Sequence, residues 1–201
     1  MREKGVIFDW GGVLDRTVDY SYRIAWDHRL GREPGTVERT VHGIEAWRLL
    51  QLGSLAEDDY RAAVREALAI SAEETMQLLG DFYQGDQVDT SLLNFVRSLH
   101  AHSEVRTGLL SNNAHFLHKR LDETRARDAF DAVVVSADIG AMKPDPATYQ
   151  AVLQALDLPA EQCIFIDDSP ANVAGARSIG MAAIHFTASV DVQTEVKGWL
   201  W

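Results

Sequence analysis

The chain contains 201 residues, of which 46% are hydrophobic and 24% charged, and its formal net charge at pH 7 is −11. This composition is typical of a globular protein with one well-buried core and room for a modest second module. The acidic balance, with no basic stripe, argues against nucleic acid and anionic membranes as partners, and no apolar run approaches the length of a membrane span.

Five short apolar runs rich in β-forming residues predict the strands of a sheet. They are residues 5–9, 105–111, 132–136, 163–167 and 182–186. The last four runs are separated by segments with helical spacing, in which Leu117 and Leu121 lie one turn apart, as do Tyr149 and Leu153. Alternating strands and helices predict right-handed βαβ units, so we expect an α/β fold built on a parallel sheet.

Two helices of this alternating region have clear start signals. Asp145 precedes Pro146 and Ser169 precedes Pro170. A capping residue before a proline at the first helical position is typical of a helix N-terminus. Gly180 predicts the end of the second helix.

Residues 17–88 break the alternation, because they contain no convincing strand and are typical of several amphipathic helices. Two capping boxes, Ser54 with Glu57 and Ser71 with Glu74, predict helix starts there. Leucines would form the core of this segment: Leu49, Leu50, Leu52, Leu78 and Leu79. We therefore expect a helical insertion at residues 17–89, between core segments at residues 1–16 and 90–201.

Three carboxylates follow strands of the predicted sheet. Asp9 ends the first run, and Asp167 and Asp168 end the fourth. In an open parallel sheet, ligands bind beyond the carboxyl ends of the strands, so we expect these side chains to lie close together. Crowded carboxylates repel one another strongly unless a cation lies between them. The sequence therefore predicts a Mg²⁺ site at this edge of the sheet.

Other polar residues fall at the same edge. Ser111 and Asn112 end the second run, and Lys143 follows the third run by a few residues. Each of them alone is typical of a helix cap, a turn or a solvated surface position. A single site at the strand ends accounts for all of them together, which favours the functional interpretation.

In order and spacing, these four segments resemble the four motifs of the haloacid dehalogenase (HAD) superfamily. The resemblance covers the whole chain: the core segments resemble the superfamily's catalytic core, and the helical insertion resembles its cap. The resemblance therefore implies a Rossmann-like parallel-sheet core with an inserted all-helical cap.

The same resemblance implies a phosphatase mechanism. Asp9 would attack phosphorus and form an aspartyl-phosphate, while Lys143 would offset charge on the nucleophile and on the transferring group. The Ser111 hydroxyl, with Asn112 and nearby backbone N–H groups, would hold phosphate oxygens. Mg²⁺ would be held by Asp9, the backbone carbonyl of Gly11, Asp167 and Asp168.

The chain departs from the family pattern at Gly11. Family phosphatases usually carry a second aspartate there, which protonates the leaving oxygen and later activates water. General acid–base help is worth roughly two to four orders of magnitude in rate, so its loss favours substrates with an easily expelled leaving group, such as a sugar 1-phosphate. This version of the motif also resembles a cytoplasmic branch that contains a glucose-1-phosphate phosphatase. Asp15 is a second hypothesis for the missing acid.

Two other functions stay open as alternatives. The first is a 2-haloacid dehalogenase, in which the carboxylate attacks carbon; such enzymes carry a tyrosine at the Gly11 position and need no metal. The second is a non-catalytic binder of a phosphate ligand. The acidic pair and the other retained motif residues favour the phosphatase over both, and the missing acid disfavours a mutase.

The remaining expectations concern partners and surroundings. The single cysteine, Cys163, excludes an internal disulfide and a cysteine zinc site, and no signal peptide is visible, so we expect a cytoplasmic protein. A small-molecule phosphate is the expected partner, and a monomer is the default state. Six insertion residues are candidates to face the substrate: Tyr20, Arg23, Trp26, His42, Trp47 and Arg48.

Overall fold

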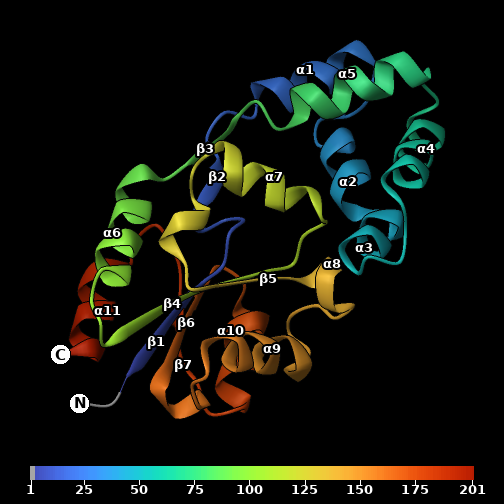
Figure 1. The fold of residues 1–201 in the computed structure, drawn as a ribbon. Helices are drawn as coiled ribbons and strands as arrows, with labels where there is room; N and C mark the ends of the chain where they lie inside the picture. Colours follow the sequence, from blue (N-terminus) through green and yellow to red (C-terminus); the bar gives the residue numbers. More distant parts are fainter. Residues whose placement is uncertain (1–2) are drawn as a thin grey trace.

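The computed structural model describes residues 3–201 and centres on a five-stranded sheet (Figure 1). Its strands are β1 (Lys4–Phe8), β4 (Val105–Ser111), β5 (Ala132–Val135), β6 (Cys163–Asp167) and β7 (Ala182–His185). They lie in the order β5-β4-β1-β6-β7, and every neighbouring pair is parallel. The predicted α/β fold and its five strands are therefore confirmed.

The register of the sheet sets the position of the site. Phe8, the last residue of β1, lies opposite Leu109 of β4 on one side and Ile166 of β6 on the other. The backbone N–H of Asp9 donates to the carbonyl of Ile166 at 2.9 Å. Because the strands end at nearly the same level, Asp9, Ser111 and the residues that follow β6 emerge at one edge.

Helices cover both faces of the sheet. They are α6 (Thr90–His100), α7 (Phe116–Glu123), α8 (Ser136–Ile139), α9 (Pro146–Leu156), α10 (Pro170–Ser178) and α11 (Val192–Leu200), with 3-10 turns at Arg127–Ala129 and Ala160–Gln162. On one face Phe8 and Ile166 pack in a cluster with residues of α6, α7 and α11. On the other face Ile7 and Phe165 pack against residues of α9 and α10. Both faces are apolar because parallel strands are buried on both sides.

The second group of helices lies between β1 and β4 in the sequence, and Figure 1 shows it beyond one end of the sheet. It comprises α1 (Ser21–Arg29), α2 (Thr36–Gly43), α3 (Glu45–Gln51), α4 (Glu57–Leu68) and α5 (Ala72–Phe82), which we call the cap. Its core includes Val41, Val64 and Phe82. Of the predicted core leucines, Leu50 and Leu78 are buried, whereas the other three are partly exposed. No helix within residues 3–201 is both long enough and apolar enough to cross a membrane.

Two short strands join the cap to the core. β2 (Asp15–Thr17) and β3 (Asp86–Val88) form an antiparallel ribbon, in which Thr17 lies opposite Asp86. The expectation that residues 17–88 contain no strand was therefore wrong, because strands this short and polar show no alternation in the sequence. Gly85 permits the close crossing here, since a Cβ on it would lie 1.9 Å from the carbonyl oxygen of Asp19.

The predicted helix starts are largely confirmed. The Asp145 side chain caps α9, and the capping box of Ser71 with Glu74 is complete. Ser169 holds the N-cap position of α10 but makes no side-chain cap bond. The box predicted at Ser54 was wrong, because the N–H of Ser54 donates to Leu49 in the turn that ends α3, and α4 begins only at Glu57.

Candidate active site

A buried lysine links two carboxylates at the edge of the sheet. The Lys143 Nζ lies 2.8 Å from Asp9 Oδ1 and 2.7 Å from Asp167 Oδ2, and it also donates to the carbonyl of Leu110 at 3.0 Å. We call Asp9, Lys143 and Asp167 the strand-end cluster. All three residues are buried, so each charge depends on the others for compensation.

Asp9 has one oxygen held and one free. Its Oδ1 accepts hydrogen bonds from the Lys143 ammonium and from the N–H of Trp10 at 2.7 Å. Its Oδ2 has no hydrogen-bond partner within residues 3–201. Burial raises the pKa of Asp9 to about 7, with the nearby Asp167 charge adding to the rise and Lys143 opposing it. The free oxygen therefore belongs to a carboxylate that is poorly compensated by the protein alone.

The two aspartates after β6 differ in their surroundings. Asp167 is fully buried and accepts from the N–H of Ser169 at 2.8 Å and from the Asn172 amide at 3.0 and 3.1 Å. The Asp168 carboxylate makes no hydrogen bond to any described residue and lies against Gly12, where a Cβ would be 2.2 Å from Oδ2. Gly12, at φ +78°, is a position that favours glycine. Partial burial and the Asp167 charge raise the pKa of Asp168.

These carboxylates fit a divalent cation. Oxygen atoms of Asp9, Asp167 and Asp168 all lie within 4.8 Å of one another. Mg²⁺ prefers oxygen ligands. Burial and the Asp167 charge raise the pKa values of Asp9 and Asp168, and a cation between these carboxylates would oppose that rise by stabilising their charged forms. Gly11 is exposed and lies in the turn after β1, two residues beyond Asp9.

The predicted phosphate-binding residues divide into two kinds. The Ser111 side chain is buried at the end of β4, and its hydroxyl makes no hydrogen bond to residues 3–201, which leaves it open to a ligand. The Asn112 side chain is engaged, because its amide donates to the carbonyl of Lys143 at 2.9 Å and accepts from the Lys143 N–H at 2.7 Å. Asn112 thus fixes the backbone that carries the cluster lysine.

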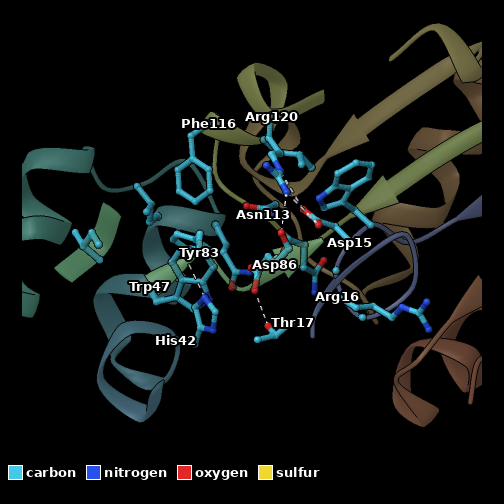
Figure 2. A pocket seen from close by; sticks show the side chains of 18 of the residues that line it. Asp15, Arg16, Thr17, His42, Trp47, Tyr83, Asp86, Asn113, Phe116 and Arg120 are labelled. Carbon is cyan, nitrogen blue, oxygen red and sulfur yellow. Dashed lines mark hydrogen bonds and ion pairs between the residues drawn. The ribbon is translucent and has the colours of Figure 1, made fainter. Parts of the chain in front are cut away.

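A cavity of about 1000 Å³ lies between the cap and the core. Its floor reaches Gly11, Gly12 and Asp168, so it extends to one carboxylate of the predicted metal site and to the turn that follows Asp9. Side chains of several cap helices and of α7 form its walls (Figure 2). The dimensions suit a small organic molecule.

Four of the six candidate cap residues line this cavity, namely Tyr20, Arg23, His42 and Trp47. The other two do not. Trp26 is buried in the cap and donates to Asp81, and Arg48 points to solvent in a pair with Glu45. Sequence reasoning missed many of the lining residues, among them Tyr60, Tyr83, Phe116 and Arg120, because no motif marks them.

Asp15 lies in the wall of the cavity but is already engaged. The Arg120 guanidinium donates to its two carboxylate oxygens at 3.1 and 3.3 Å. A carboxylate held in this way is a hydrogen-bond acceptor, so the contacts give no support to Asp15 as a proton donor.

The fold is a parallel α/β sheet with a helical insertion, and carboxylates and a lysine gather where its strands end. A model of the haloacid dehalogenase-like hydrolase family matches residues 3–180, which is most of the chain. The chain therefore belongs to this family of enzymes.

Individual relatives agree with this assignment. The chain is 27% identical over 198 residues to the sesquiterpene phosphatase astK of Aspergillus oryzae, covering 96% of this chain and 95% of that protein. It is 25% identical over 188 residues to the β-phosphoglucomutase of Bacillus subtilis, covering 90% and 82%. Among solved structures, the HAD family enzyme BT-2542 of Bacteroides thetaiotaomicron, in complex with magnesium and inorganic phosphate, superposes with a TM-score of 0.77 at 21% identity. That superposition covers 96% of this chain and 98% of the other.

Proposed function

We propose that this protein is a Mg²⁺-dependent phosphatase that hydrolyses a small organic phosphate through an aspartyl-phosphate on Asp9. The observation that carries the proposal is the state of Asp9: one oxygen is fixed by Lys143 and Trp10, and the other is free at the edge of the sheet. A nucleophile needs both a fixed orientation and an unblocked lone pair.

The neighbouring residues have complementary roles in this proposal. The Lys143 ammonium neutralises negative charge as phosphoryl transfer proceeds, and the open Ser111 hydroxyl donates to a phosphate oxygen. Asn112 acts indirectly by holding the Lys143 backbone. Such a site works by positioning and charge neutralisation, which is what phosphoryl transfer requires.

Asp9, the Gly11 carbonyl, Asp167 and Asp168 are the proposed Mg²⁺ ligands. When bound, the ion would neutralise phosphate charge and orient the transferring group. Asp168 is the carboxylate best placed for direct contact, because the structure gives it no other partner within residues 3–201. Asp167 also accepts hydrogen bonds from Asn172 and Ser169 and pairs with Lys143, so besides its proposed role as a ligand it orients the cluster.

The leaving group is constrained by Gly11. Since no side chain there can supply a proton, the substrate is one whose oxygen departs easily, and a sugar 1-phosphate satisfies this condition. Relatives support a phosphate substrate without fixing its organic part, because one is named for a sesquiterpene and another for phosphoglucose.

The test is phosphate release from a panel of sugar phosphates, nucleotides and p-nitrophenyl phosphate. Each substrate is measured with Mg²⁺, with EDTA, and with Asp9→Asn. We expect Mg²⁺-dependent release that falls at least about 10³-fold in the variant. Release that survives both EDTA and the substitution would contradict the proposal, and EDTA-resistant halide release from 2-haloacids would replace it with dehalogenation.

A further inference from the structure

Aromatic rings from both the cap and the core meet in the cavity wall. Trp47 of α3 stacks on Phe116 of α7, with ring centroids 6.1 Å apart and an interplanar angle of 28°. Tyr83, just after α5, lies 6.2 Å from the Phe116 ring, and Tyr60 of α4 lies 5.6 Å from the Trp47 ring. Figure 2 shows Trp47, Tyr83 and Phe116 grouped on one side of the cavity. We call Trp47, Tyr60, Tyr83 and Phe116 the aromatic wall.

Most polar side chains on the cap side of the same cavity already have a hydrogen-bond or ion-pair partner within the protein. His42 contacts Glu38 through Nδ1 and the Tyr83 hydroxyl through Nε2, each at 3.2 Å. Arg23 donates to the carbonyl of Phe82 at 3.1 Å and pairs with Glu38. Further pairs complete the pattern: Arg23 with Asp86, Gln51 with the Asn112 carbonyl, Tyr60 with the Val41 carbonyl, and Arg120 with Asp15.

This pairing decides what kind of molecule the cavity suits. A polyol would have to break existing hydrogen bonds in order to make its own, and every group left unpaired would cost binding free energy. A flat apolar body needs only contact with ring faces, and aromatic pairs contribute beyond the area they bury. The wall therefore favours a ring over a sugar.

The loop after β1, which lacks a proton donor at Gly11, also favours an aromatic substrate. Gly11 offers no proton to the leaving oxygen, and a phenol, with a pKa of about 10, is a far stronger acid than an aliphatic alcohol. A phenolate can leave without protonation, whereas an alkoxide needs help. The two observations are independent, since one concerns the cavity wall and the other the loop after β1.

We propose that the substrate is a phosphate monoester of an aromatic alcohol, with its ring against the aromatic wall; this rests on the proposed phosphatase function. A bond forms between Asp9 Oδ2 and phosphorus as the bond between phosphorus and the oxygen that carries the aromatic ring breaks. The aryloxide leaves with the electron pair and takes a proton from water. A second water then hydrolyses the aspartyl-phosphate, which gives inorganic phosphate and restores the carboxylate.

The first experiment separates the ring from the leaving group. With Mg²⁺ at pH 7, kcat/KM is measured for 1-naphthyl phosphate, acetyl phosphate, glucose 1-phosphate and farnesyl phosphate. We expect naphthyl phosphate to exceed each of the others at least tenfold. Acetyl phosphate shares the good leaving group but lacks the ring, so equal values for these two would overturn the role of the wall. A preference for the sugar or the isoprenyl ester would also overturn the inference, while no release from any of the four would instead overturn the phosphatase function.

The second experiment changes the wall itself. Phe116→Ala and Trp47→Ala should each lower the ratio of kcat/KM for naphthyl over acetyl phosphate about five- to tenfold, because each removes a stacking face. Tyr22→Ala is the matched control, since Tyr22 is an exposed aromatic residue of the cap that lies outside the cavity, and it should leave the ratio unchanged. Quenching of tryptophan fluorescence by 1-naphthyl phosphonate gives a readout that needs no turnover. Unchanged ratios in variants that remain folded by circular dichroism would contradict the proposal.

The third experiment supplies the missing acid. A Cβ on Gly11 would meet no atom within 4 Å, so the first side-chain atom of Gly11→Asp has open space. It should raise turnover of farnesyl phosphate about tenfold or more relative to naphthyl phosphate, because only the alkoxide needs protonation. Equal changes for both esters would show that leaving-group acidity does not select the substrate.

Discussion

The strand-end cluster and the aromatic wall are built in opposite ways. The cluster residues Asp9 and Asp167 directly follow or end neighbouring strands, and the parallel register brings them together. The wall draws single rings from α3, α4, α7 and the turn after α5. In the cluster every charge depends on its neighbours, whereas the rings of the wall are held separately by different cap and core elements. In our proposal, catalysis therefore depends on the cluster as a unit, whereas each ring of the wall contributes separately to substrate selection.

The sharpest test of this contrast is Lys143→Met. The substitution leaves two buried carboxylates, Asp9 and Asp167, without the ammonium that contacts both. We expect the free energy of unfolding at pH 7 to fall by about 3–5 kcal/mol and phosphate release to be lost. Urea denaturation and the phosphate assay measure the two effects. In the control, Lys119→Met, removal of a lysine whose side chain is 80% exposed should change stability by no more than about 0.5 kcal/mol. Similar losses in both variants would mean that the cluster is not cooperative.

The pH dependence of stability gives the next effect. Because the pKa of Asp9 is raised to about 7 in the folded protein, the folded state keeps a proton that the unfolded chain releases near pH 4. Between about pH 4 and pH 7 this group therefore lowers stability as the pH rises. In EDTA, Asp9→Asn should raise Tm by roughly 5 °C at pH 8 and hardly at all at pH 4.

Adding Mg²⁺ should reduce or reverse the Tm advantage that Asp9→Asn has over the wild type in EDTA. Wild-type protein should gain thermal stability with increasing Mg²⁺, since the ion binds only the folded state, and the variant should gain less. Equal gains in the two proteins would place the ion away from Asp9. A Tm difference in EDTA that is the same at pH 4 and pH 8 would contradict the account of the buried carboxylate.

The smallest expected change in stability comes from the N-terminus of α5, which belongs neither to the strand-end cluster nor to the aromatic wall. Ser71→Ala removes the hydroxyl that caps α5 and should lower the free energy of unfolding by about 1 kcal/mol, with no change in kcat. Ser54→Ala is the control, because Ser54 caps no helix in the structure and its loss should cost almost nothing. If the two variants were equally stable by urea denaturation, the assignment of the helix starts would be wrong.

Much of the sheet, and the gathering of carboxylates at one of its edges, could be predicted because both depend on local patterns. Short apolar runs ending in Asp9 and Asp167 are visible in the sequence, and parallel topology then leaves one edge where they can meet. Capping before Pro146 is equally local. The motifs behind the family resemblance are local too, and the match of the family model to residues 3–180 confirms that resemblance.

The cavity wall could not be predicted in this way. Phe116 and Tyr83 have no neighbours in the sequence that mark them as lining residues, and their side chains meet only when the cap rests on α7. Trp26 shows the converse, because an aromatic residue typical of a substrate contact is buried in the cap instead. The engagement of Asn112 with Lys143 likewise depends on two loops meeting in space.

The β2–β3 ribbon determines how the cap is connected to the core. Thr17 and Asp86 are paired neighbours, so the whole cap leaves and rejoins the core at one point of the ribbon. In chain topology, the five helices of the cap form the loop of the β2–β3 hairpin. The entropic cost of closing such a loop grows only slowly with its length. A two-residue turn in place of the cap would therefore leave the Rossmann-like core topologically complete. A different cap on the same ribbon would also have to replace the contacts that Gln51 makes with Asn112 and Ser136 of the core.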